Sequence, residues 1–157
     1  MTVKPIPDGF QTITPYLHVK GAGQAIEFYK KAFNAVVIVR MDLPGGQVGH
    51  AEIRIGNSMI MLGDEQPAMN IAGPETRGGV TTSFYVYVEN VDLAFPKALA
   101  AGGTEIRPVQ NMFWGDRIGV LRDPFGHEWS LSTHVEDVPP EEMDKRMKAA
   151  MQTGACG

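Results

Sequence analysis

Residues 114–129 read WGDRIGVLRDPFGHEW, and this stretch predicts a strand, a tight turn and a second strand. The run 123–126 (DPFG) has turn chemistry, because aspartate accepts backbone hydrogen bonds, proline fixes φ and glycine tolerates the last position. After the turn, apolar Trp129 and Leu131 alternate with polar residues, which is typical of a strand with one buried face. We therefore expect Trp129 and Leu131 in the core. Two strands alone are marginal in water, so the hairpin requires further strands.

The hairpin closes a β-α-β-β-β pattern, and the same pattern occurs earlier in the chain. The expected elements of the earlier copy are 12–19, 22–33, 35–43, 50–55 and 58–62. Those of the later copy are 81–89, 93–101, 105–109, 117–122 and 127–133. Asp92 is the expected cap of the later helix, and Asn34 ends the earlier one. Such a repeat of architecture, with almost no sequence identity, predicts two modules joined side by side.

The chain is thus divided into five segments. They are an extended lead-in (1–11), a first βαβββ module (12–63), a linker rich in proline and glycine (64–79), a second βαβββ module (80–134) and a helical tail (135–157). In the tail, Met143, Met147 and Met151 recur at helical spacing. This apolar stripe is expected to pack on the chain itself or on a second copy.

Composition limits the classes of partner. The chain has 157 residues, 43% of them hydrophobic, and a net charge of -4, so it has no basic surface suited to nucleic acid. Cys156 is the only cysteine, which excludes an intramolecular disulfide. No signal peptide and no apolar run of about 20 residues is recognised, so neither secretion nor a membrane span is expected. We expect a cytoplasmic protein.

Two segments carry a resemblance to a known superfamily, namely 25–29 (AIEFY) in the first helix and 123–127 (DPFGH) in the last hairpin. With the doubled βαβββ order, they resemble the vicinal oxygen chelate superfamily, which includes glyoxalase I, bleomycin resistance proteins and extradiol dioxygenases. The resemblance covers about 13–133. Further segments resemble its PhnB-like branch: 49–53, 59–62, 115–117 and 136–139. The implied fold class is α+β, with two modules forming a curved, incomplete barrel that encloses a cleft, plus the C-terminal helix.

The resemblance also implies four positions at which metal-dependent members carry ligands. In this chain those positions fall on Thr14, Met61, Ser83 and Ser130. Divalent metals require imidazole or carboxylate ligands, which a thioether and three hydroxyls do not replace. We therefore expect no metal of the family type and no other cofactor.

Strand alternation assigns further side chains to the cleft. On the third strand of the first module, His50, Glu52 and Arg54 face it, and His50 with Glu52 is a candidate acid–base pair. Arg117 is taken as the counterpart of His50 and as an anchor for an anionic group. The alternatives are that His50 and Glu52 belong to a solvated sheet face and that Arg117 pairs with Glu52 or Glu128. The expected ligand-binding residues are His50, Glu52, Arg54, Ser83, Tyr85, Trp114, Arg117, Glu128 and Ser130.

The function expected from these residues is the binding of a small polar, aromatic or anionic molecule in the cleft, without the family metal. The sequence does not decide whether a reaction is catalysed. The alternative is a metal-dependent lyase, isomerase or dioxygenase with a relocated site, for example His50, Glu52 and either His18 or His134. A third reading is a surface that recognises protein. Because family members pair modules between chains, we expect a homodimer.

Overall fold

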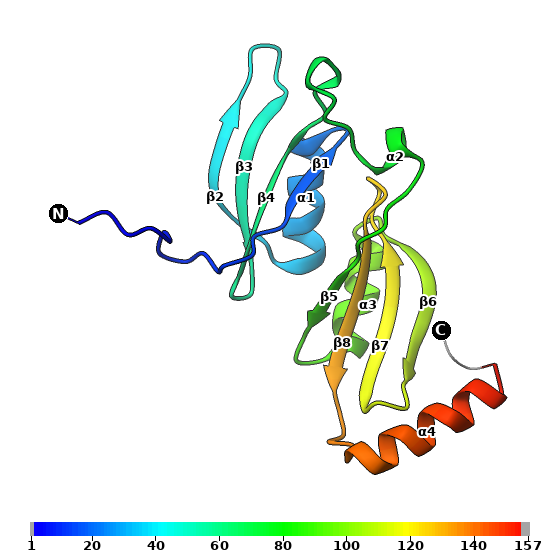
Figure 1. The fold of residues 1–157 in the computed structure, drawn as a ribbon. Helices are drawn as coiled ribbons and strands as arrows, with labels where there is room; N and C mark the ends of the chain where they lie inside the picture. The colour runs from blue at the N-terminus through cyan, green and yellow to red at the C-terminus, as the bar shows by residue number, and fades with distance from the viewer. Residues whose placement is uncertain (1, 155–157) are drawn as a thin grey trace.

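In a computed structural model, the chain forms two βαβββ modules followed by a helix, and the structure describes residues 2–154. This order confirms the α+β fold class and the repeat (Figure 1). The first module comprises β1 (Tyr16–Val19), α1 (Ala22–Phe33), β2 (Val36–Asp42), β3 (Val48–Ile55) and β4 (Ser58–Asp64). The second comprises β5 (Phe84–Tyr87), α3 (Val91–Ala100), β6 (Thr104–Asn111), β7 (Asp116–Arg122) and β8 (Glu128–His134).

Two short helical turns, η1 (Pro67–Met69) and α2 (Pro74–Arg77), lie in the connection between the modules. The strands agree with the expected ranges to within a few residues, with β1 and β5 shorter than expected. Each sheet has four strands, in the orders β1-β4-β3-β2 and β5-β8-β7-β6. In both sheets the first strand runs parallel to the last, and the other neighbours are antiparallel.

The two module helices begin in the same way. The side chain of Asp64, at the end of β4, accepts the backbone N–H groups of Gly21 and Ala22 at 2.9 and 2.8 Å. At the end of β8, Thr133 Oγ1 accepts the N–H of Val91 at 2.8 Å. A side chain from the last strand of each module thus satisfies donors that a helix start leaves unpaired.

The expected cap of the second helix was wrong by two residues. The N-cap of α3 is Asn90, whose side chain accepts the N–H of Asp92 at 3.0 Å, and the helix starts at Val91. Asparagine is as good a cap as aspartate. Asp92 is therefore left free to pair with a side chain on the sheet. The helix over 22–33 and its stop at Asn34, which adopts the left-handed conformation, are confirmed.

The modules share one core, centred on the predicted turn. Asp123 is buried, and its Oδ2 accepts the hydroxyl of Tyr29 from α1 at 2.7 Å and Nε1 of Trp129 from β8 at 2.9 Å. Its Oδ1 accepts the N–H groups of Phe125 and His127, which close the turn. Burial and the neighbouring Asp123 carboxylate raise the pKa of Tyr29 well above its usual range, so its hydroxyl stays a donor. One carboxylate thus holds the turn and joins the first module to the second.

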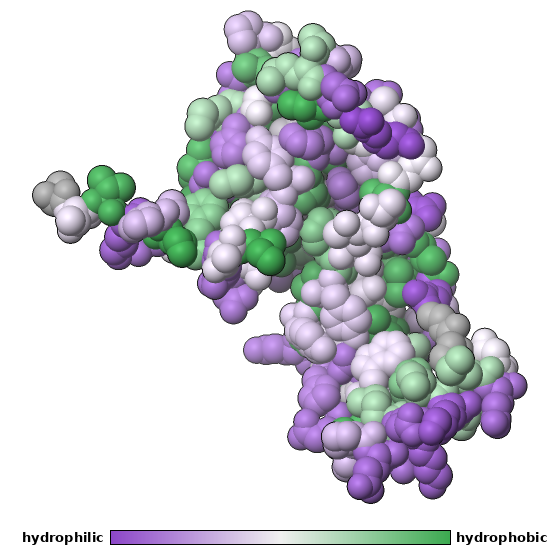
Figure 2. All heavy atoms as spheres, in the orientation of Figure 1, coloured by the Kyte–Doolittle hydropathy of each residue, from purple (hydrophilic) through white to green (hydrophobic). Residues whose placement is uncertain are grey.

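The tail forms α4 (Pro140–Gln152), which lies below the second sheet in Figure 1. Arg146 of α4 pairs with Glu136, which precedes the helix, at 2.8 Å, and with Glu142 of the same helix at 2.9 Å. The outer side of α4 is largely hydrophilic in Figure 2. Of the methionine stripe, Met143 is half-buried, whereas Met147 and Met151 are 40% and 66% exposed, so the described part of this chain leaves most of the stripe uncovered. None of the helices described is both long and apolar enough to cross a membrane.

The expected burial of Trp129 and Leu131 is confirmed, and Ser130 between them faces the other side of the sheet. Replacing Trp129 with alanine should lower the free energy of unfolding by roughly 3–5 kcal/mol, the cost of truncating a buried aromatic side chain. Ser130→Ala should cost clearly less, because its side chain is only half-buried. Urea denaturation of both variants measures the difference. Equal costs would show that the two faces of β8 have been assigned the wrong way round.

Candidate functional site on the uncovered sheet faces

Helices cover one face of each sheet and leave the other face open (Figure 1). Directly paired residues of neighbouring strands point to the same face. In the second sheet, Phe84 pairs with Trp129 on the helix side, whereas Tyr85 pairs with Ser130 on the open side. In the first sheet, Tyr16 pairs with Met61, which in turn pairs with Glu52. The open faces therefore carry most of the polar side chains that alternation predicted for the cleft.

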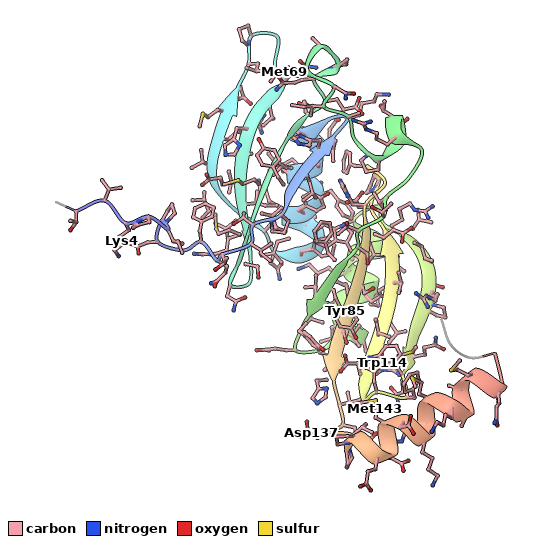
Figure 3. All side chains as sticks on the ribbon, viewed as in Figure 1. Lys4, Met69, Tyr85, Trp114, Asp137 and Met143 are labelled. Atoms are coloured by element: carbon pink, nitrogen blue, oxygen red, sulfur yellow. The ribbon has the colours of Figure 1, made fainter. Side chains whose placement is uncertain are left out.

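On the second sheet, five side chains form what we call the tyrosine–aspartate cluster: Tyr85, Tyr87, Trp114, Asp116 and His134. Its centre is Asp116, which is only 2% exposed. The Asp116 carboxylate accepts the hydroxyls of Tyr85 at 2.6 Å and Tyr87 at 3.0 Å, and its other oxygen lies 2.7 Å from Nδ1 of His134. Trp114 Nε1 donates to the Tyr85 hydroxyl at 3.3 Å. Figure 3 shows Tyr85 and Trp114 in the lower part of the second module.

The cluster combines a buried charge with exposed rings. Burial acts to raise the pKa of Asp116, but hydrogen bonds from Tyr85, His134 and Tyr87 outweigh it, so the pKa is lowered. The Asp116 carboxylate is therefore ionised, and burial together with its hydrogen bond raises the pKa of Tyr85. The rings of Tyr85 and Tyr87 lie 5.3 Å apart and are 46% and 64% exposed. The site thus presents two fixed aromatic faces to solvent.

The turn between β6 and β7 positions this cluster. Gly115 has φ +98°, and a Cβ there would meet the carbonyl oxygen of Glu136 at 2.0 Å. The carbonyl of Gly115 also accepts the N–H groups of Val135 and Glu136. Only glycine fits this close approach. The chain after β8 is thereby held against the turn that carries Trp114 and Asp116.

On the first sheet, a second set of side chains, which we call the Tyr16–His50 group, comprises Tyr16, His18, His50 and Glu52. The Tyr16 hydroxyl lies 2.8 Å from Nδ1 of His50, and Nε2 of His50 lies 3.4 Å from Glu52 Oε1. The rings of Tyr16 and His18 are stacked with centroids 4.8 Å apart. The predicted pair of His50 and Glu52 is thus present, and a tyrosine from β1 extends it.

The placement of Arg117 on the open face was wrong. Arg117 pairs in the sheet with Thr133, which caps α3, and its guanidinium binds Asp92 of α3 at 2.8 to 3.1 Å and Asn111 at 3.0 Å. The register explains the error. Met61 and Ser130 are equivalent positions on the last strands of the two modules. Met61 pairs with Glu52 and Ser130 pairs with Val120, so Val120 corresponds to Glu52. Two residues earlier on each strand, Ile118 therefore corresponds to His50. A shift of one residue moves a side chain to the opposite face.

The other predicted residues are spread over the two sheets. Arg54 is exposed at the end of β3, Ser83 is exposed just before β5, and Ser130 is half-buried beside the tyrosine–aspartate cluster. Glu128 pairs with Arg122 at 2.9 Å rather than with Arg117. Within residues 2–154, no hydrogen bond, ion pair or ring contact joins the predicted residues of one module to those of the other. The predicted residues therefore form two sets, one on each sheet.

Sequence reasoning missed the roles of Asp116 and His134. Asp116 lies inside the stretch that predicted the hairpin, but an aspartate beside a turn glycine is usually read as part of the turn. His134 enters the sequence analysis only as a possible ligand of a relocated metal site. The pairing of Asp116 with His134 in the sheet brings the two together. A search for acids opposite histidines across the expected hairpin could have found them.

The residues at the family's metal positions do not suit a metal. Thr14 precedes β1 and Ser83 precedes β5, while Met61 and Ser130 offer a thioether and a hydroxyl. Nor does any group of three or more His, Cys, Asp or Glu side chains that could hold a metal ion occur among the described residues. Neutral hydroxyls and a thioether supply none of the charge or imidazole nitrogens that such a site uses.

Comparison with known proteins identifies the class. The model of the Glyoxalase/Bleomycin resistance protein/Dioxygenase superfamily matches residues 11–131, and the chain belongs to this superfamily.

Some known proteins are similar to this chain in sequence, and some solved structures are similar to it in fold. An uncharacterized protein of Mycobacterium bovis is 39% identical over 140 residues, which cover 87% of this chain and 92% of the relative. Among solved structures, TioX from Micromonospora sp. ML1 is 26% identical with a TM-score of 0.63, covering 80% of this chain and 99% of TioX. A PhnB protein from Bacillus cereus is 24% identical with a TM-score of 0.63, covering 78% and 99%. The PhnB protein thus shares the fold of this chain.

The tyrosine–aspartate cluster should make stability depend on pH through His134. Hydrogen bonds to Asp116 and Asp137 raise the pKa of His134 above the usual value of about 6.5. The charged His134 ring therefore stabilises the folded protein fully below about pH 6.5, the usual pKa that applies in the unfolded chain. This stabilisation is lost as the pH rises through the higher pKa that His134 has in the folded protein. The difference in Tm between wild type and His134→Gln should be largest near pH 5 and should shrink above about pH 7. A difference that is constant with pH would contradict this assignment.

Proposed function

We propose that the protein binds a small polar aromatic molecule against the open sheet faces. The observation that carries this proposal is the pair of exposed rings of Tyr85 and Tyr87, whose hydroxyls are held by the buried carboxylate of Asp116. Covering exposed aromatic rings with a ligand is favourable because it removes apolar surface from water. Rings that are already ordered also lose little conformational entropy when a ligand binds. Trp114 adds a third aromatic surface beside them.

Anion binding is less well supported than aromatic contact. Arg117, the expected anchor, is engaged by Asp92 on the helix side of the sheet. On the open faces, Arg122 is paired with Glu128, and Arg54 lies at an exposed strand end. The alternative of a metal-dependent lyase, isomerase or dioxygenase finds no ligand set among residues 2–154. The binding of a neutral or weakly acidic aromatic compound is therefore the function we propose.

We further propose that two copies assemble so that the first-module face of one lies opposite the second-module face of the other. Two features support this arrangement. The two polar sets lie on different sheets of one chain, and a second copy would bring such halves together. In addition, the outer strand β2 exposes a row of apolar side chains, namely Val36, Val37, Ile38 and Met41. An open, apolar strand edge of this kind favours pairing with another chain.

Ligand-observed NMR with a set of small aromatic compounds tests the binding proposal on the pure protein. For the best compound, Tyr85→Ala should weaken binding by about tenfold, the equivalent of 1.4 kcal/mol. Leu93→Ala is the matched control, because Leu93 is an exposed apolar residue on α3, away from the open face. Affinity that is equally affected by both variants, or by neither, would contradict the proposed site.

Sedimentation equilibrium tests the assembly. We expect a mass of roughly twice 17.1 kDa at micromolar concentration, because the exposed row on β2 and the methionine stripe are apolar surfaces suited to a second copy. Ile38→Lys should shift the equilibrium toward the monomer, since a charge on an edge strand opposes pairing. A single species near 17.1 kDa for the wild type would refute the dimer.

A further inference from the structure

The Tyr16–His50 group contains a hydroxyl, an imidazole and a carboxylate in series. The Tyr16 hydroxyl lies 2.8 Å from Nδ1 of His50, and Glu52 lies 3.4 Å from Nε2 on the other side of the ring. All three side chains stand on the open face of the first sheet, on β1 and β3. His50 and Glu52 are partly buried, with side-chain exposures of 24% and 18%, whereas the ring of Tyr16 reaches solvent. The series therefore leads from the surface into a more enclosed part of the face.

The directions of the hydrogen bonds follow from the chemistry of the groups. An ionised carboxylate can only accept, so Nε2 of His50 carries the proton that is directed at Glu52. In the neutral ring Nδ1 is then bare and accepts the Tyr16 hydroxyl. Burial raises the pKa of Tyr16, which keeps this hydroxyl protonated and donating. The oxygen of Tyr16 still has lone pairs available on its solvent side.

We propose that Tyr16, His50 and Glu52 form a proton relay that accepts the proton of an acidic aromatic hydroxyl on a bound ligand. This rests on the proposed function and specifies the ligand class for the first-module face. The ligand hydroxyl donates its proton to the oxygen of Tyr16 while the Tyr16 proton passes to Nδ1 of His50. The products are a ligand phenolate, a neutral tyrosine and an imidazolium. Atoms and charge balance without any further reactant.

The surroundings favour this ligand class. Tyr16 and His18 stack at 4.8 Å, so a ligand ring placed at the hydroxyl of Tyr16 has aromatic neighbours. An imidazole can act as a general base toward a hydroxyl that is within hydrogen-bond reach. A phenol gives up its proton far more readily than an aliphatic alcohol, so the relay favours an aromatic hydroxyl.

The charged groups nearby leave the relay intact. Glu52 supplies the negative charge that stabilises the imidazolium, and Arg54 is the next charged residue on the same face of β3. His18 lies on β1, and burial lowers its pKa, so it stays neutral at neutral pH. The neighbouring strands place methionines opposite the relay, with Met41 of β2 paired to His50 and Met61 of β4 paired to Glu52. These methionines carry no charge.

Binding of 4-nitrophenol to the full-length protein tests the relay, because the anion of this acidic phenol absorbs visible light. The absorbance is followed as the pH is varied at saturating protein. We expect the anion to bind about tenfold or more tightly than the neutral phenol, so that the apparent pKa of the bound compound falls by about one unit or more. His50→Gln should abolish the shift, since an amide cannot take up the proton, and Glu52→Gln should reduce it.

The control is Glu27→Gln, the same substitution at an acid on α1, which should leave the shift unchanged. Thermal denaturation checks that each variant is folded. A bound phenol with no pKa shift, or a shift that survives His50→Gln, would refute the relay. If 4-nitrophenol fails to bind while other aromatic compounds depend on Tyr85, the relay is refuted and the proposed function stands. If no aromatic compound binds at all, both fail.

Discussion

The carboxylate of Asp123 is the contact on which both modules depend. It is buried, yet it accepts two backbone N–H groups of its own turn, an indole N–H and a tyrosine hydroxyl. A buried charge is tolerated only when its hydrogen bonds are satisfied, and here four donors satisfy them. Because Tyr29 belongs to the first module and Trp129 to the second, satisfying this charge fixes how the modules meet. The aromatic side chains of Phe33 and Trp129 then pack around the same point.

The two open faces use the same backbone for different chemistry. The first carries a tyrosine–histidine–glutamate series with the histidine at its centre. The second carries an aspartate at its centre, surrounded by two tyrosines and a histidine. Equivalent strand positions therefore hold unlike residues, such as His50 and Ile118. This divergence supports the proposal that each module contributes a distinct half of the site. One half would accept a proton, and the other would contact an aromatic ring.

Much of the architecture was predictable because its signals are local. The turn at 123–126, the helix from Ala22 to Phe33 and the alternation around Trp129 each depend on residues close together in the chain. The cleft residues were less predictable. Tyr85, Trp114, His50 and Glu52 do contribute to hydrogen-bonded groups on the open faces. Arg117 does not, because the strands of the two modules were aligned with an error of one residue, which reverses the face.

The sequence by itself determined the βαβββ repeat, its turns and which strand residues alternate into the core, since period and turn chemistry act over a few residues. Only the tertiary structure decided which polar side chains meet. Tyr29 and Asp123 are 94 residues apart, Tyr16 and His50 are 34 apart, and Tyr85 and Asp116 are 31 apart. Such contacts depend on strand register and on the packing of one module against the other, and no pattern along a single strand encodes them.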